Sequence, residues 1–492
     1  MIARALVVAA IFAGAFAVPA VPAAASLSTS ACGKLDLPET GIQGEVPLKD
    51  QLSGRALKGY NCGLALVGHV ALEGVAANMA WAGHCAYVAT VGEGVNVVDV
   101  STPQRPRRTA QLRGPGTTVS VETIAARQIG RRAVLVVGRY GYFAHAPVTA
   151  PMDIYDATDC AHPKFLATLH WPENIHNLTI SPDGSRVYAT LPLQVADIRD
   201  PRHPRFLGNI ENGLVGSPFT THGPQISAHE VAVSPDGNTI YFGGQTPMSR
   251  GFMVADVTNY PQRKPRLLMK ADGRGHSINV ATINGRAYAV HSEESVASPT
   301  AKGCITQTLN PVAGAAQPWL SDVSDRAHPR MRVSQLTLAI NDKQNCKREV
   351  ADDENASVHY HDVDNPSRTT FVMASMWNAG LRIFDVRDPL RPKEVAYFNP
   401  GAFLRPSDDV TIDKAWSHVR YDAGTGQIWF ATQSGGFWVV ELEPQVRARL
   451  GLAPVAVLHP SGAVPRPAST NFVLSPAIPV AQYYCTLGAI GA

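Results

Sequence analysis

Short segments in which apolar and polar residues alternate run through most of the chain, and turn residues separate them. Residues 187–190, 240–243 and 428–432 are such segments, and residues 181–184 (Ser-Pro-Asp-Gly) form one of the turns. Alternation with a period of two, rich in β-branched residues and bounded by Pro, Gly and Asp, is typical of β-strands. No long segment has the apolar spacing of three and four residues that an amphipathic helix requires. The pattern therefore predicts an all-β chain.

Seven of these strands end in nearly the same phrase: an apolar run, an acidic residue, and a proline a few positions later. The phrase recurs over tens of residues, which is typical of repeat proteins, and a unit of four short antiparallel strands is the blade of a β-propeller. We interpret the six repeated Asp residues as turn caps, because Asp side chains accept hydrogen bonds from nearby backbone N–H groups. They are Asp99, Asp156, Asp197, Asp256, Asp322 and Asp385, and Glu441 takes the acidic position in the last phrase.

The last unit stops after its third strand, near Leu442. Residues 61–70, close to the start of the chain, are similar to the fourth strand of an earlier unit at residues 204–210. A strand supplied from the front would pair the open edge of the last sheet and close the ring. We therefore predict an all-β fold: a seven-bladed β-propeller of four-stranded antiparallel blades over residues 61–444, with the last blade closed by an N-terminal strand.

The two ends of the chain differ from the repeats. Arg4, an apolar run and small residues up to Ala25 predict a signal peptide over residues 1–25, which is too short to span a membrane. Residues 26–60 form an N-terminal extension, and residues 445–492 an Ala/Pro-rich C-terminal tail. We expect an extracytoplasmic protein, periplasmic or secreted, with no transmembrane segment.

All 7 cysteines follow the predicted signal peptide, in a compartment that permits oxidation. Cys62 at the start of the closing strand and Cys85 in the first blade are expected to form a disulfide across the ring seam. Cys304 and Cys346 flank a large insertion and form the second expected pair. A third pairing of Cys32 with Cys485 would leave Cys160 odd, and the odd count also allows a free thiol.

Lys and Arg number 43 against 40 Asp and Glu, a net charge of +3, with no basic cluster. This balance argues against nucleic acid as a partner. The sequence also lacks a Gly-rich phosphate loop, a Ser-centred nucleophile elbow and a Cys-x-x-Cys metal motif. We expect a small-molecule ligand at the channel mouth, and a protein partner stays an open alternative.

Two segments, GEGVNVVDVSTPQRP at residues 92–106 and NAGLRIFDVRDPLRPKEVAYF at residues 378–398, resemble the LVIVD-repeat family of seven-bladed propellers. This resemblance implies the fold and says little about chemistry. Residues 373–398 are also similar to blades of the exported selenium-binding protein/methanethiol oxidase propellers. That second resemblance implies histidines directed at a copper centre and oxidase chemistry, without a residue-by-residue match of metal-binding motifs.

Histidine recurs at the start of the innermost strand, thirteen residues before an equivalent position of the second strand. Glu122 takes this place in the second blade and Ala77 in the first. Equal offsets would bring the side chains to one level around the central channel. The histidines are His176, His229, His276, His361 and His418.

Three interpretations of this histidine ring remain open. Imidazole nitrogens with the Glu122 carboxylate could bind a transition metal, copper rather than zinc. The imidazoles could instead act as general acids or bases on a ligand without metal. They could also bind neighbouring blades by hydrogen bonds, as buried polar groups must.

Further residues lie on loops that we expect at the channel mouth, where propeller loops shape specificity. Together with the ring, they favour a metal-dependent, copper-type oxidoreductase acting on a small molecule. The alternative is a non-catalytic ligand- or protein-binding propeller whose histidines are structural. The substrate-binding candidates are His359, Asp408, Asp409, Arg139, Tyr140, His291 and Trp377.

Overall fold

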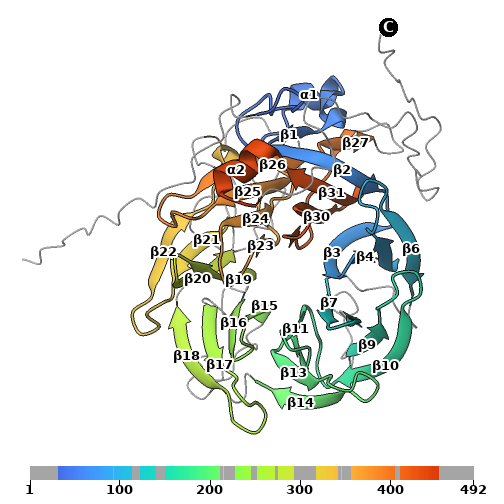
Figure 1. Cartoon of the computed structure of the whole chain (residues 1–492), viewed down its shortest axis with the longest axis vertical. Helices are drawn as coiled ribbons and strands as arrows, with labels where there is room; N and C mark the ends of the chain where they lie inside the picture. The colour runs from blue at the N-terminus through green and yellow to red at the C-terminus, as the bar shows by residue number, and fades with distance from the viewer. Residues whose placement is uncertain are drawn as a thin grey trace, which may run out of the picture.

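Seven antiparallel sheets stand around a central axis in the computed structural model, each running outward from the centre (Figure 1). The predicted seven-bladed β-propeller is confirmed. The structure describes residues 32–453 except 92, 114–121, 140–149, 211–213, 215–227, 245–251, 272–274, 293–316, 342–344, 346–355 and 405–409.

The first five blades each take four strands from one continuous stretch of chain. Blade 1 contains β3 (Val75–Ala82), β4 (Cys85–Val91), β5 (Gly94–Asp99) and β6 (Arg107–Leu112), and blade 2 contains β7 (Ile124–Ile129), β8 (Arg132–Gly138), β9 (Ala150–Asp156) and β10 (Lys164–Trp171). Blade 3 contains β11 (Leu178–Ile180), β12 (Arg186–Ala189), β13 (Gln194–Asp197) and β14 (Arg205–Asn209), and blade 4 contains β15 (Ala228–Val233), β16 (Thr239–Gly244), β17 (Phe252–Asp256) and β18 (Arg266–Ala271). Blade 5 contains β19 (Ser277–Ile283), β20 (Arg286–Ser292), β21 (Trp319–Asp322) and β22 (Arg330–Gln335).

The last two blades each receive a strand from the N-terminal part of the chain. β2 (Leu64–Val70) pairs with β31 (Gly436–Leu442) and completes blade 7, as predicted. β1 (Tyr60–Cys62) pairs with β26 and adds a fifth strand to blade 6, which the sequence did not predict. Gly63, with a φ of 70°, separates the two strands. The remaining strands are β23 (His361–Val363), β24 (Phe371–Ser375), β25 (Leu381–Asp385) and β26 (Lys393–Asn399) in blade 6, β29 (Arg420–Asp422) and β30 (Gln427–Thr432) in blade 7, and the separate hairpin β27 (Ala402–Leu404) and β28 (Val410–Ile412).

Apolar side chains fill the spaces between neighbouring blades. All six residues of β30 are buried, as expected for a middle strand covered on both faces. Val88 of blade 1 packs in one cluster with Trp429 and Val439 of blade 7, so the seam of the ring has a continuous core. This packing fixes the innermost strands around the channel.

The repeated Asp residues cap the turns after the third strands, as predicted. Asp99 accepts a hydrogen bond from the backbone N–H of Ser101 at 2.9 Å, and Asp385 accepts one from Arg387 at 3.0 Å. The same bond, to the N–H two residues on, recurs at Asp156, Asp197, Asp256 and Asp322.

The N-terminal extension packs on the outer edge of blade 6. It contains α1 (Leu48–Leu52) and a 3₁₀-helix (Arg55–Lys58). Its Glu39 carboxylate pairs with the fully buried Arg382 of β25. At the other end of the chain, α2 (Pro444–Leu450) follows β31, and a short 3₁₀-helix (Ala339–Asn341) lies between blades 5 and 6 in sequence. Among the described residues, no helix is long and apolar enough to cross a membrane.

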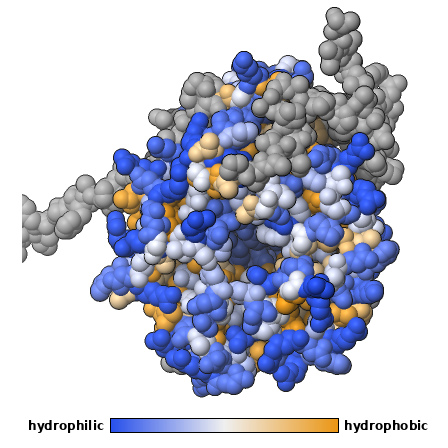
Figure 2. All heavy atoms as spheres, viewed as in Figure 1, coloured by the Kyte–Doolittle hydropathy of each residue, from blue (hydrophilic) through white to orange (hydrophobic). Residues whose placement is uncertain are grey.

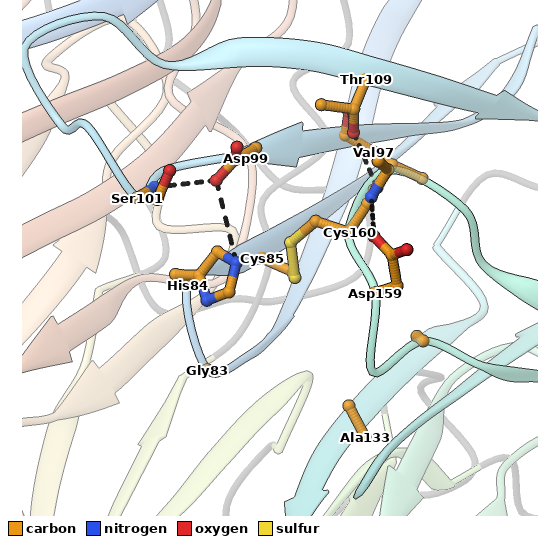
Figure 3. Close-up of a disulfide and its surroundings, with 12 residues drawn as sticks. Gly83, His84, Cys85, Val97, Asp99, Ser101, Thr109, Ala133, Asp159 and Cys160 are labelled. Carbon is orange, nitrogen blue, oxygen red and sulfur yellow. Dashed lines mark hydrogen bonds and ion pairs between the residues drawn. A yellow bond between two sulfur atoms is a disulfide. The ribbon is translucent and has the colours of Figure 1, made fainter. Parts of the chain in front are cut away.

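The disulfides correct the predicted Cys62–Cys85 pair. Cys62 bonds to Cys32 of the extension, and Cys85 bonds to Cys160, which the sequence analysis left odd (Figure 3). Cys62 ends β1 beside blade 6, whereas Cys85 begins β4 and faces the turn after β9 in blade 2. The prediction failed because residues 61–70 were treated as one strand of blade 7. Cys304, Cys346 and Cys485 lie outside the described residues.

Candidate metal centre

Strand pairing places three side chains at the same level of the innermost strands. Ile124 pairs with Val137, Leu178 with Ala189, and His361 with Ala374. The positions two residues before each of these inner residues are occupied by Glu122, His176 and His359. By register, the blade 6 counterpart of His176 is therefore His359 and not His361.

A difference in hairpin length explains this shift. His361 and Ala374, which pair, are thirteen residues apart, whereas Leu178 and its partner Ala189 are eleven residues apart. Side chains on one face of a strand repeat every two residues. The two extra residues in the blade 6 hairpin therefore place His359, and not His361, at the level of His176. Equal offsets in sequence therefore do not give equal depth in the channel.

His229 reaches the same region through a β-bulge. The register of β15 shifts between Ala228 and Glu230, so His229 is the extra residue of the bulge. Bulges often redirect a side chain beside a functional site. Here the imidazole of His229 turns toward His176 of the preceding blade, with the two Nε2 atoms 2.6 Å apart.

Three imidazoles, from blades 3, 4 and 6, approach the carboxylate of Glu122, next to blade 2. The carboxylate of Glu122 lies 3.1 Å from Nε2 of His176 and 3.8 Å from Nε2 of His229. Its other oxygen lies 3.3 Å from Nε2 of His359. All four residues are buried, with exposures of 1 to 7%. Potential ligand atoms of Glu122, His176 and His229 lie within 4.8 Å of one another. We call Glu122, His176, His229 and His359 the hub cluster.

The hydrogen bonds of two imidazoles fix which nitrogen carries the proton. Nδ1 of His229 lies 3.0 Å from the carbonyl oxygen of His276, and Nδ1 of His359 lies 2.6 Å from that of Trp416. A carbonyl oxygen only accepts, so both Nδ1 atoms must donate. In a neutral imidazole the lone pair is then on Nε2, which faces Glu122. This is the tautomer and orientation that metal-ligating histidines adopt.

Neighbouring groups shift the pKa values of Glu122 and His229. Burial alone would raise the pKa of Glu122, but its interactions with His359 and His176 outweigh burial and hold this pKa well below its usual value. Burial, followed by repulsion from His276 and His176, lowers the pKa of His229 well below that of a free imidazole. The hub cluster thus offers the carboxylate of Glu122 and, at His229, an unprotonated nitrogen.

Tyr360 fills the channel beside the hub cluster. Its hydroxyl donates to Glu122 at 3.1 Å and accepts a hydrogen bond from Asn177 of blade 3 at 3.1 Å. Its ring stacks on His418 with centroids 4.1 Å apart, and the residue is fully buried. Tyr360 is not among the predicted site residues. Its place between His359 and His361, just before the innermost strand β23, was the available signal.

His361 and His418 join different partners from those of the hub cluster. Nδ1 of His418 lies 3.1 Å from Asp362, and its Nε2 lies 3.5 Å from Glu230 across the channel. Burial opposes protonation of His418, but Asp362 and Glu230 outweigh it and raise its pKa to about 9. Nδ1 of His361 lies 2.5 Å from the side-chain oxygen of Asn279 in blade 5. These two imidazoles connect blades.

His276 forms a second layer around the hub cluster. Its ring stacks on His229 with centroids 3.6 Å apart and lies 5.1 Å from the ring of His359. Its backbone carbonyl is the acceptor that orients His229. The five predicted histidines therefore divide among three environments: His176 and His229 beside Glu122, His276 against them, and His361 and His418 elsewhere in the hub.

Of the other predicted substrate-binding residues, Trp377 is linked to the hub cluster through Trp416. It stacks on Trp416 with ring centroids 4.9 Å apart and planes 10° apart, and Trp416 in turn lies 4.3 Å from the ring of His359. Arg139 pairs with Asp153 at 3.2 Å. His291 lies inside blade 5, with Nε2 2.9 Å from the hydroxyl of Ser321. Tyr140, Asp408 and Asp409 lie outside the described residues.

The surface is hollowed at the centre of the ring, where the seven blades meet (Figure 2). The innermost strands surround this axis, and the hub cluster lies on β15 or just before β7, β11 and β23 (Figure 1). Metal binding by residues of this kind needs no sequence motif, since the ligands come from four separate blades.

Comparison with known proteins finds one matching family model. Residues 73–108 match the LVIVD repeat. None of the curated proteins matches the chain. The matched residues run from just before β3 to the start of β6. The chain thus carries an LVIVD repeat, and that repeat forms the first three strands and the start of the fourth in blade 1 of its seven-bladed propeller.

Proposed function

We propose that this protein binds one transition-metal ion at the hub cluster, through Glu122, His176, His229 and His359. The observation that carries the proposal is the pair of Nδ1–H···O=C bonds of His229 and His359. They direct two Nε2 lone pairs at a region that already holds a carboxylate. Lone pairs and a negative charge repel each other unless a proton or a metal cation lies between them.

Copper is the metal that these ligands favour over zinc. Imidazole nitrogen suits Cu, Zn, Fe and Ni, and copper binds most tightly in the order of divalent first-row metals. A bound copper ion would supply one-electron chemistry. We therefore propose a copper-type oxidoreductase that acts on a small molecule entering the channel. Tyr360 fills the channel next to Glu122, so the ligand would approach the hub cluster from the side away from this ring.

The alternative function is a non-catalytic binding propeller with structural histidines. The contacts of His361 with Asn279 and of His418 with Asp362 favour this interpretation for these two residues. Both histidines bond half-buried polar groups of a neighbouring blade. The metal proposal therefore excludes them from the ligand set and retains them as supports of the hub.

We also propose that the protein is exported. The apolar N-terminal segment with small residues before Ala25 is typical of a signal peptide. The two disulfides are consistent with an oxidising compartment. Export would place the hub cluster where copper and small extracytoplasmic substrates are accessible.

Elemental analysis tests the metal proposal. Protein purified from the exported fraction should contain about one equivalent of copper, and metal-free protein should melt at a higher temperature after copper is added, because a ligand of the folded state stabilises it. The double variant His176→Ala/His229→Ala should lose both effects. The control His203→Ala changes a histidine whose side chain is 81% exposed and should retain both. Absence of stoichiometric metal, together with unchanged melting on adding copper or zinc, would reject the proposal.

A further inference from the structure

In the N-terminal extension the acidic side chains face the protein interior, and the lysine side chains face outward. All four carboxylates between residues 32 and 59 are turned inward: Asp36, Glu45 and Asp50 are 6 to 9% exposed, and the side chain of Glu39 is 8% exposed. The three lysines of the same segment, Lys34, Lys49 and Lys58, are exposed. Outward charge on the described part of the extension is therefore entirely positive.

Each inward carboxylate has a structural use. Asp50 accepts hydrogen bonds from Thr40 at 2.5 Å and Tyr60 at 2.9 Å. Asp36 accepts one from the backbone N–H of Gly63 at 2.9 Å. These bonds explain why the acids are buried, but they do not explain why the outer side carries lysine and leucine.

Three exposed leucines lie close in sequence to Lys49 and Lys58, and Leu35 lies beside Lys34. Leu52 is 80% exposed, and Leu48 and Leu57 are each 40% exposed. Leu48 and Leu52 are four residues apart on α1 and share one face of the helix. Leu57 lies on the following 3₁₀-helix (Arg55–Lys58), which packs against α1. We call Leu48, Lys49, Leu52, Leu57 and Lys58 the leucine–lysine face.

We propose that the leucine–lysine face docks on an anionic lipid surface. Leucines that enter the interfacial region and lysines that contact acidic headgroups are the two signals by which peripheral proteins bind membranes. A second copy of this chain is a poorer occupant, since it would bring Lys49 and Lys58 against like charges. The two exposed lysines favour a negative partner, and the leucines favour one with an apolar layer beneath its charges.

The position and rigidity of the face suit this role. Figure 1 shows α1 at the outer rim of the ring, beyond β1. The extension is fixed to blade 6 by the ion pair of Glu39 with Arg382 and to β1 by the Cys32–Cys62 disulfide. A face that is already ordered loses little conformational entropy on binding.

Vesicle co-sedimentation of the full chain tests this proposal. Vesicles of phosphatidylcholine mixed with phosphatidylglycerol should retain the protein, and vesicles of phosphatidylcholine alone should retain much less. Added salt should weaken the binding. Leu52→Ser should lower the partition into mixed vesicles about tenfold. Lys49→Gln/Lys58→Gln should lower it ~20-fold and remove the preference for phosphatidylglycerol.

The matched control is Leu390→Ser, since Leu390 is 44% exposed in the turn between β25 and β26, outside the extension. This variant should bind as the unchanged protein does. Equal retention by both kinds of vesicle, or equal loss in Leu52→Ser and Leu390→Ser, would overturn the proposal. Self-association in sedimentation velocity that Leu52→Ser abolishes, without vesicle binding, would assign the face to a second copy instead. All of these readouts are independent of metal at the hub cluster.

Discussion

The hydroxyl of Tyr360, in blade 6, donates a 3.1 Å hydrogen bond across the channel to the carboxylate of Glu122, next to blade 2. The same hydroxyl accepts a bond from Asn177, so its proton is committed to Glu122. The phenol therefore holds one of the two carboxylate oxygens in a fixed direction. Glu122 is the residue that all three imidazoles of the hub cluster approach.

Tyr360→Phe should weaken copper binding without unfolding the propeller. The variant removes the hydroxyl that orients Glu122 and keeps the ring that stacks on His418. Loss of an outer partner of a metal ligand typically lowers affinity ~10- to 100-fold. Chelator competition on metal-free protein measures this change. Unchanged copper affinity in a folded variant would show that Tyr360 only fills the channel.

His359 and His361 should respond differently to the same substitution. His359→Ala removes an imidazole 3.3 Å from Glu122 and should weaken copper binding by more than ~100-fold, the upper value for an outer partner. His361→Ala should leave copper binding unchanged. It should lower the free energy of unfolding by about 1 kcal/mol, because the half-buried side-chain oxygen of Asn279 loses its partner.

Chelator competition and urea unfolding distinguish the two variants. A loss of copper affinity in His361→Ala equal to that in His359→Ala would contradict the assignment that strand register gives. It would instead support a ring of equivalent ligands at all five predicted histidines.

The blades could be predicted from the sequence because each repeat contains its own alternating strands and its own turn-capping residue. Asp99 and Asp385 bond the N–H two residues on, as their sequence context predicts. Closure by residues 64–70 was also predictable, since an unpaired third strand requires a partner. These features depend on residues close together in sequence or on one missing strand.

The hub cluster was only partly predictable, because its geometry depends on hairpin lengths and on one bulge. Counting thirteen residues from the second strand selects His361, whereas pairing places His359 beside Glu122. The bulge that turns His229 toward His176 has no signature in the local alternation of β15. Tyr360 reaches Glu122 across the channel, a contact between blades that no local pattern encodes.

Stability of the metal-free protein should fall as pH rises through the range set by His418. Its imidazole is close to Asp362 and Glu230, with further influence from Glu122, and it lies near His361. These carboxylates outweigh burial and raise the folded-state pKa to about 9, against about 6.5 in the unfolded chain. A raised pKa contributes stability that is complete below pH ~6.5 and is lost by pH ~9.

The expected loss is about 3 kcal/mol of unfolding free energy between these limits. Urea unfolding at several pH values measures it. His418→Gln cannot carry the charge, so its stability should change much less over the same range. A parallel decline in both proteins would assign the pH dependence to other groups.

Arg382 fastens the N-terminal extension to the propeller through buried charge. Its guanidinium is fully buried, donates to Glu394 at 3.0 Å and to the carbonyl oxygen of Ala379 at 2.7 Å, and pairs with Glu39 of the extension. Burial raises the pKa of Glu39 in spite of this cation. The arrangement leaves two carboxylates dependent on a single positive charge.

Arg382→Met should therefore destabilise the protein by about 3–5 kcal/mol, since removal of one partner leaves buried charge uncompensated. The triple variant Arg382→Met/Glu39→Gln/Glu394→Gln should recover most of this loss, because it removes the carboxylates' charge together with the arginine. Urea unfolding gives the free energies, and proteolysis near residues 34–58 reports release of the extension. Equal instability of the single and triple variants would show that charge does not hold the extension in place. Packing of the arginine side chain would then hold it, including the contact of the guanidinium carbon with the ring of Tyr397 at 4.7 Å.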